Sequence, residues 1–317
     1  MKRHQSKLYL LAGLAAAAII SAFESSMSPY YYQVAIYIGI NIVLALSLNI
    51  INGFAGQFSL GHAGFMALGA YTSAVITTSL GIEGSDITGI LVFALALVCG
   101  GCIASLFGLL VGVPSLRLKG DYLAITTLGF GEIIRVIIQN LDFLGAARGF
   151  TGIPKLSNFL WVFGAAGILA YTVANLINST YGKGFIAVRD DEVAAASIGI
   201  NTTRYKVIAF VTGAFFAGIA GGLYAHFITY INPSQFGFLK SFEIVVMVVV
   251  GGMGSFTGVI LSAILLTILP EALRGIAQYR MVMYALLLVI IMLSRPQGLF
   301  ARGLRVKRYL KQTPAAT

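Results

Sequence analysis

Charged residues are scarce in this chain of 317 residues. Asp, Glu, Lys and Arg together make up 10% of the sequence, whereas a typical soluble domain contains about 25%. A soluble fold of this length could not cover its surface with so few charges. Apolar residues make up 58% of the chain. The composition excludes a soluble enzyme, a disordered chain and a nucleic-acid-binding domain, and it indicates an integral membrane protein.

Histidine and cysteine are also rare. The three histidines, His4, His62 and His226, are scattered, and the two cysteines, Cys99 and Cys102, lie inside one apolar run. A metal site would need further ligands near this C-x-x-C pair, and thiols in lipid lack the electropositive setting that makes thiolates reactive. We interpret both cysteines as small apolar helix residues. We expect no metal and no cofactor, and a membrane enzyme would need clustered His, Asp or Glu that the sequence does not supply.

Apolar runs long enough to cross a bilayer follow one another along the chain. A membrane helix needs about 20 apolar residues, and unbroken runs of this length indicate helices rather than the alternating strands of a barrel. We expect an all-α, polytopic transmembrane bundle of about 8–10 helices, which forms a single domain over residues 1–317. The runs lie at 8–23, 30–51, 60–80, 87–113, 121–139, 159–177, 207–230, 242–269 and 279–294.

The first run, 8–23, resembles a secretory signal peptide because a basic segment precedes it. Its apolar stretch of about 16 residues is slightly long for that role. The residues that follow it also contain no good Ala-x-Ala cleavage site. We therefore interpret this run as a retained first span, with a cleaved signal as the alternative.

The net charge of +10 is concentrated at the two ends of the chain. Lys2, Arg3 and Lys7 precede the first run, and the tail 295–317 carries bases and no acid. Bases flank the cytoplasmic ends of membrane spans and face anionic lipid headgroups. We therefore expect both termini in the cytoplasm and an even number of crossings. By the same rule the basic loops 114–120 and 178–206 face the cytoplasm, and the loops 24–29 and 81–86, which contain acids and no base, face out. The loop 140–158 has charges of both signs and faces out by alternation.

Two glycine-rich segments interrupt the apolar pattern. A break at 251–255 would divide the run 242–269 into two short helices, and this turns nine runs into an even number of crossings. The segment 52–64 is a similar break. Paired glycine-interrupted segments in a transporter point to a substrate path and an internal repeat. The compatible alternative is that these glycines only let helices pack closely.

Polar residues near these breaks form a candidate translocation path. Ionisable groups inside membrane helices are costly and often functional, and Glu132 and Arg135 are spaced to form an ion pair on one helix face. Structural hydrogen bonds and ion pairs are the alternative role for each of these residues. The candidate path residues are Asn52, Gly56, Gln57, His62, Glu132, Gly251 and Gly254.

The longest cytoplasmic connection, 178–206, contains a short helix with its own start and stop signals. Asp190 can cap its N-terminus, and Asp191 and Glu192 place negative charge in the first turn. Gly199 supplies the left-handed residue at the C-terminal end. A helix of about eight residues is marginal alone in water, and its exposed side of alanine and short aliphatic residues favours docking. We expect a coupling helix that fits a groove on another protein, and an ordinary interfacial loop helix is the alternative.

A motor that drives transport through this helix must be a separate chain. The sequence has no Gly-x-x-x-x-Gly-Lys-Ser/Thr phosphate-binding loop. The segment Gly182-Lys183-Gly184 lacks both the first glycine at the required spacing and the hydroxyl.

Five stretches of the chain resemble the M-type permease subunit of the branched-chain amino acid ABC importers. They follow one another over nearly the whole sequence, at 49–71, 120–135, 151–154, 187–200 and 251–258. In that family a Glu-x-Ala-Ala-x-x-x-Gly element in the cytoplasmic loop is the ATPase contact. Here it falls on Glu192, Ala194, Ala195 and Gly199. The resemblance therefore implies an ATPase-coupling segment made of these residues with Asp190 and Asp191.

The resemblance implies a permease of ten membrane helices that has no ATPase activity of its own and imports leucine, isoleucine or valine. It also implies an H-type permease as heterodimer partner, two cytosolic ABC ATPases, and a periplasmic or lipid-anchored substrate-binding protein. The implied location is a bacterial inner membrane. Two alternatives stay open. Urea and short-chain amide permeases share this architecture, and an ion-coupled secondary transporter would use an intramembrane carboxylate such as Glu132.

Overall fold

The computed structural model describes residues 28–81, 87–115, 118, 120–273 and single positions between 282 and 299. This part of the chain is helical, as predicted, and contains one isolated β-bridge between Phe150 and Ile231. The longer helices are α2 (Pro29–Asn49), α3 (His62–Ser79), α4 (Ile87–Ser115), α5 (Asp121–Gln139), α6 (Phe159–Asn178), α7 (Thr180–Asp190), α9 (Thr202–Ile228), α10 (Phe238–Gly251) and α11 (Phe256–Ala272). The shorter elements are η2 (Ile50–Phe54), η3 (Asp142–Leu144), η4 (Ala146–Arg148), α8 (Glu192–Ser197) and η5 (Pro233–Phe236).

Most predicted runs within the described residues are helices at the expected places. Helices long and apolar enough to cross a membrane occupy Pro29–Phe54, Ile87–Pro114, Phe159–Asn178, Thr202–Ile228 and Pro233–Gly251. The runs 60–80 and 121–139 form α3 and α5. The predicted run 8–23 lies outside the described residues, as do most of the run 279–294 and of the tail 295–317.

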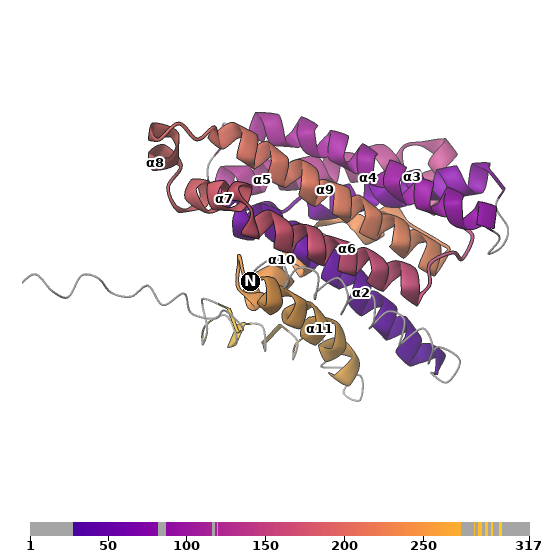
Figure 1. Cartoon of the computed structure of the whole chain (residues 1–317). Coiled ribbons are helices and arrows are strands. Elements are labelled where there is room, and N and C mark those ends of the chain that lie inside the picture. Colours follow the sequence, from indigo (N-terminus) through magenta and orange to yellow (C-terminus); the bar gives the residue numbers. More distant parts are fainter. Residues whose placement is uncertain are drawn as a thin grey trace, which may run out of the picture.

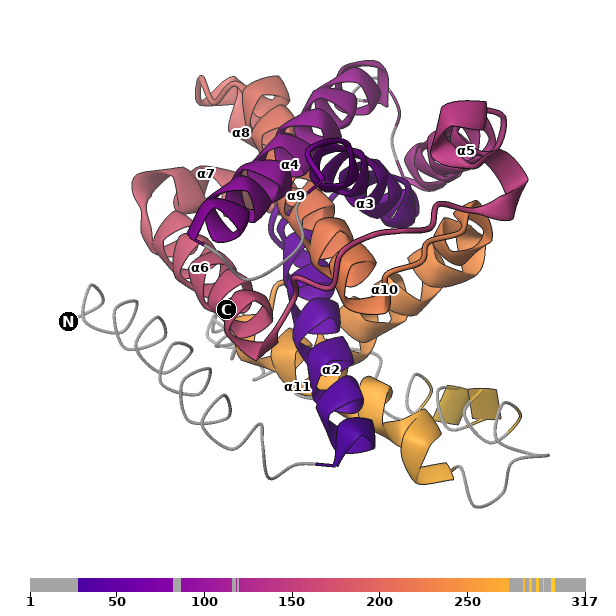
Figure 2. The ribbon, with the colours of Figure 1, turned by 90° about the vertical axis from the view of Figure 1, so that its right-hand side faces the viewer.

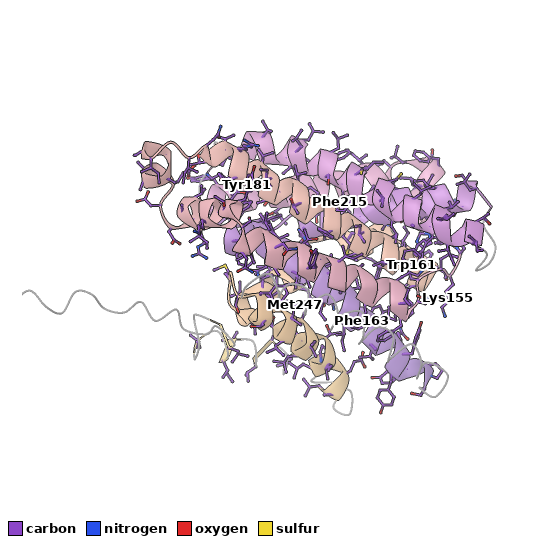
Figure 3. All side chains as sticks on the ribbon, in the orientation of Figure 1. Lys155, Trp161, Phe163, Tyr181, Phe215 and Met247 are labelled. Atoms are coloured by element: carbon purple, nitrogen blue, oxygen red, sulfur yellow. The ribbon has the colours of Figure 1, made fainter. Side chains whose placement is uncertain are left out.

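The bundle has two ends that differ in their connections (Figure 1). The α7–α8 end holds the connections 55–61, 179–201 and 252–255. The opposite end holds the connections 140–158 and 229–237, where the Phe150–Ile231 bridge forms. Figure 3 shows the same polarity along α6, with Lys155 and Trp161 at the opposite end and Tyr181 at the α7–α8 end.

Helices α2 and α9 lie near the middle of the bundle (Figure 2). Helix α9 packs against α3 and α4, and α2 packs against α9, α6 and α11. Small residues allow the closest of these contacts: a Cβ atom on Gly69 would overlap the carbonyl oxygen of Gly218 in α9. The central helices are therefore packed backbone to backbone, as small residues permit in membrane proteins.

Helix α4 presents a continuous apolar face to the outside of the bundle. Cys99 and Cys102 are exposed on it, with Leu95 and Leu106 one turn away on either side. Both thiols thus lie among aliphatic side chains, as the sequence interpretation expected.

The break predicted at 251–255 divides the run 242–269 into two helices, α10 and α11, which form a tight hairpin. Gly252 and Gly254 both have positive φ, at 93° and 81°, so the chain reverses on residues that need no Cβ. Ser262 in α11 donates a hydrogen bond to the carbonyl of Met247 in α10. The expectation of two short helices around a glycine turn is confirmed.

Two predicted boundaries are wrong. The break expected at 52–64 is only 55–61, because the π-turn η2 continues α2 to Phe54 through bonds such as Ala55 N to Ile50 O at 3.1 Å. The connection 178–206 contains a second helix, α7, before the predicted coupling helix. Ser179 caps α7 by accepting a hydrogen bond from Gly182 N, a start signal that the sequence interpretation overlooked.

Candidate functional site

The two glycine-rich segments predicted at 52–64 and 251–255 lie against each other at the α7–α8 end. A Cβ atom on Gly53 would overlap the backbone nitrogen of Gly254, so these segments approach as only glycine allows. The side-chain amide of Asn49 joins them. Its Oδ1 accepts a hydrogen bond from Gly254 N at 2.9 Å, and its Nδ2 donates to Ser255 O at 3.4 Å. The breaks therefore form one packed unit, which supports the close-packing interpretation of their glycines.

Arg189, at the end of α7, contacts both breaks at once. Its Nη1 donates a hydrogen bond to Gly53 O at 3.4 Å. Gly56 has φ of 68°, and a Cβ there would lie 2.6 Å from the Cγ of Arg189. A Cβ on Gly254 would lie 3.0 Å from its Nη1. One side chain thus connects the segment before α8 to the two interruptions of the membrane helices.

Sequence reasoning missed Arg189. The residue was counted only as one of the bases that assign the 178–206 loop to the cytoplasm. Its position directly before the acidic start of the coupling helix was the available signal, and it lies within the stretch 187–200 that carries the family resemblance.

The polar residues of the first break are buried. Asn52, Gln57 and His62 are 5%, 4% and 0% exposed. Asn52 Oδ1 accepts a hydrogen bond from Ser59 N at 3.1 Å, and His62 Nε2 lies 2.8 Å from Ser47 Oγ. These bonds satisfy polar groups where lipid and protein exclude water. Among the described residues, the buried atoms Gln57 Oε1 and His62 Nδ1 form no hydrogen bond within the protein.

Glu132 does not lie with the other candidate path residues. It forms the expected ion pair with Arg135, at 2.6 Å, and its Oε1 also accepts a hydrogen bond from Phe238 N at 3.0 Å. Phe238 begins α10, whereas Gly251 and Gly254 lie at and just beyond the other end of that helix. The structure therefore separates the predicted path residues into a cluster at the α7–α8 end and a single carboxylate near the opposite end.

The predicted coupling helix is shorter than expected and has a different cap. Helix α8 has six residues, Glu192–Ser197, and Asp191 caps it by accepting hydrogen bonds from Val193 N and Ala194 N at 2.9 and 3.0 Å. The assignment of Asp190 as the cap is wrong. Asp190 is the last residue of α7, and its carboxylate pairs with Arg189 at 2.9 Å.

The surface of α8 also differs from the expected small apolar face. Ala195 is 2% exposed because it packs inside the chain, so it is not part of the exposed side. Val193 and Ile198 are 69% and 76% exposed, next to the exposed Ala194. The exposed side is therefore bulkier than alanine alone would make it.

Two contacts fix the position of α8. Glu192 forms an ion pair at 2.6 Å with Lys206, at the start of α9, rather than leaving its charge for a partner protein. Gly199 has φ of 85°, and Ile200 N bonds Ala195 O at 3.0 Å. These features confirm the predicted glycine stop. The result is a rigid, capped turn that presents aliphatic side chains outward.

The comparisons with known proteins cover nearly the whole chain. Residues 30–293 match the family model described as "Branched-chain amino acid transport system / permease component". The chain is 36% identical over 330 residues to the high-affinity branched-chain amino acid transport system permease protein LivM of Escherichia coli K12, covering 93% of this chain and 75% of that protein. It is 27% identical to LivH of the same organism, covering 82% of this chain and 91% of LivH.

A further relative is less similar in sequence. The probable branched-chain amino acid transport permease protein LivM of Methanocaldococcus jannaschii is 26% identical, over 84% of this chain and 92% of that protein. No solved structure matches the chain. The family resemblance that the sequence motifs indicated is confirmed, and this chain belongs to the family of branched-chain amino acid transport permease components.

Proposed function

We propose that this chain is the M-type membrane subunit of an ATP-driven importer of leucine, isoleucine and valine in a bacterial inner membrane. The observation that carries the proposal is the similarity to LivM over 93% of the chain. LivH is a second permease of the same system by name, and its weaker similarity to this chain supports a heterodimer of related M-type and H-type subunits. Two separate ATPases and a substrate-binding protein complete the proposed importer.

The proposed orientation has the α7–α8 end in the cytoplasm. Lys183, Arg189, Arg204 and Lys206 are all in the connection at this end or beside it. Basic residues accumulate in cytoplasmic loops, which supports this orientation. This orientation agrees with both termini in the cytoplasm and with an even number of membrane crossings. The family resemblance implies that this number is ten.

In this importer α8 docks in a groove on an ATPase. Val193 and Ile198 are the exposed aliphatic side chains that would enter the groove, next to Ala194. Asp191, Glu192, Ala195 and Gly199 hold the helix in shape through the cap, the ion pair, the internal packing and the stop. The proposed coupling segment therefore adds Val193 and Ile198 to the predicted residues, and Asp190 supports it from the end of α7 by pairing with Arg189.

Arg189 carries the movement of α8 to the translocation path. Because its side chain contacts both glycine breaks, a displacement of α7 and α8 changes the packing of Gly53 and Gly56 against Gly254. Asn52, Gln57, His62 and Gly251 lie in or next to the two breaks and form the cytoplasmic part of the proposed path. Glu132 lies at the opposite end of the proposed path, beside the start of α10.

The test is uptake of radiolabelled leucine by cells that produce this chain with its partner subunits and lack other leucine transporters. Uptake should persist when the proton gradient is collapsed and ATP is maintained, and isoleucine and valine should compete. Loss of uptake with the gradient, at constant ATP, would instead identify an ion-coupled transporter. Uptake of urea without uptake of leucine would identify an amide permease.

A further inference from the structure

A small polar cavity lies between α2, α9, α10 and α11, near the opposite end of the bundle. Its volume is about 250 Å³, which is room for a small solute rather than for one water. Lys240, Glu243 and Glu271 contribute charges to its lining, and Tyr37, Tyr224 and Pro270 contribute apolar surface. Helix α2 begins at this end, α10 begins here, and α11 ends here. The cavity therefore lies at the end of the bundle opposite to the α7–α8 end.

The charged groups in the cavity are bonded to one another and to polar neighbours. Lys240 Nζ donates hydrogen bonds to Glu243 Oε2 at 3.0 Å and to Asn41 Oδ1 at 3.4 Å. Asn41 in turn donates to Thr267 Oγ1 at 2.9 Å, and Tyr30 donates to the carboxylate of Glu271. The side chains of Lys240 and Glu243 are 21% and 38% exposed. Both charges are thus partly buried but open to a solute that enters the cavity.

The apolar part of the lining is formed by Tyr37, Tyr224 and Pro270, which are all partly exposed. Ile40 and Leu266 are 2% and 1% exposed and belong to the core of the bundle beneath the cavity lining. The cavity therefore offers a cation, carboxylates and an apolar wall within one small volume. An amino acid with an aliphatic side chain has the complementary groups: a carboxylate, an ammonium and a branched hydrocarbon.

Two other cavities in the described part of the chain lack this combination. The one between α3, α4 and α5, of about 410 Å³, has no charged residue in its lining. The one beside Lys155 and Trp161 has a cation and no carboxylate. A zwitterion placed in either cavity would leave at least one of its charges without an oppositely charged partner, at a cost in desolvation.

We propose that the cavity between α2, α9, α10 and α11 is a transient binding site for zwitterionic aliphatic amino acids. Lys240 binds the carboxylate, Glu243 and Glu271 bind the ammonium, and Tyr37, Tyr224 and Pro270 contact the side chain. The proposal rests on the proposed importer function. Lys240 and Glu243 must exchange their mutual bond for bonds to the solute, so the site binds weakly and releases readily, as a translocation path requires.

The first experiment uses L-photo-leucine, a photoreactive analogue of leucine, with the complete transporter in proteoliposomes during ATP-driven uptake. After illumination the labelled peptides are mapped by mass spectrometry. We expect labelling on the peptides that contain Tyr37, Tyr224 or Pro270, and loss of that labelling in Lys240→Gln and Glu243→Gln. Labelling confined to other segments, or labelling that both variants leave unchanged, would overturn the proposal.

The second experiment measures leucine uptake by the same variants. Each should reduce uptake at low leucine about tenfold, the equivalent of one lost charge-assisted hydrogen bond, while Lys155→Gln should retain wild-type uptake. The exchange Lys240→Glu with Glu243→Lys should stay defective, because the charges then stand in the wrong order along the apolar wall. Restored uptake in the exchange variant would assign the pair a structural role only and overturn the proposal.

The outcomes separate this site from the importer function itself. If the wild-type transporter imports leucine and the cavity variants do so equally well, the site is absent and the importer function stands. If the wild-type transporter does not import leucine at all, the importer function fails before any variant is measured.

Discussion

The α7–α8 end and the opposite end of the bundle are built from different contacts. At the α7–α8 end, two glycine breaks meet backbone to backbone, and Asn49 and Arg189 bind them together. At the opposite end, ion pairs such as Lys240–Glu243 line an open cavity. Backbone contacts leave no room for adjustment, whereas ion pairs can exchange partners. We therefore expect substitutions at the first end to stop the whole transport cycle and substitutions at the second to change how the solute is bound.

The largest expected effect comes from Gly254→Leu and Gly56→Leu. Both positions have positive φ, which costs a residue with a Cβ about 1–2 kcal/mol, and both face Arg189 at 3.0 Å or less. Leucine uptake should fall to background in each variant. Gly129→Leu is the matched control, because this exposed glycine of α5 has no atom within 4 Å of its Cβ position. Wild-type uptake in both variants at normal membrane levels would refute the close-packing argument.

Arg189→Lys should have the next largest effect. Lysine keeps the charge but lacks the planar fork with which Arg189 binds both Asp190 and Gly53 O. We expect uptake to fall about threefold to tenfold, with the ATPases still bound and ATP hydrolysis less stimulated by transport. Arg204→Lys, at an exposed position of the same connection, should behave like wild type. Loss of the bound ATPases in the Arg189 variant would place this residue in docking rather than in coupling.

Ile198→Asp tests the exposed side of α8. A charge on this 76% exposed aliphatic residue should weaken co-purification of the ATPases about fivefold, an effect of roughly 1 kcal/mol. Ser197→Asp adds the same charge at a polar position of the same helix and should have less effect. Equal retention of the ATPases in Ile198→Asp and wild type would make α8 an ordinary connector.

The smallest expected effect is on stability. Glu192→Gln removes the partner of Lys206, whose side chain is 10% exposed, and leaves a largely buried ammonium without its carboxylate. We expect the melting temperature of the purified transporter to fall by about 2–4 °C, the shift typical of roughly 1 kcal/mol. Adding Lys206→Met to Glu192→Gln should restore most of the lost melting temperature, because the buried ammonium is then also removed. A double variant less stable than Glu192→Gln would contradict this explanation.

The sequence predicted those features that depend on neighbours along the chain. Helical runs, the glycine turn at 252–255 and the stop at Gly199 follow from local composition and backbone preference. The cap was misassigned from Asp191 to Asp190 because both residues have the same chemistry and lie side by side. Their roles differ because α7 ends at Asp190, which leaves Asp191 as the non-helical residue directly before α8.

Contacts between distant segments could not be predicted in this way. Asn49 and Gly254 are 205 positions apart, and no local pattern indicates that they bind each other. Lys240 was missed for a different reason. Hydropathy placed the start of the run at 242, after this charged residue, whereas α10 begins at Phe238 because Lys240 is neutralised by Glu243 within the helix.

The bond from Arg189 to Gly53 O also sets a scale for mechanical transmission. At 3.4 Å it is near the longest separation at which an N–H group still bonds a carbonyl. A retreat of α7 by about 1 Å takes this donor and acceptor beyond hydrogen-bond range unless the side chain of Arg189 extends to follow. In the proposed importer, a short displacement of α8 by the ATPase is therefore enough to change how Arg189 holds the two breaks.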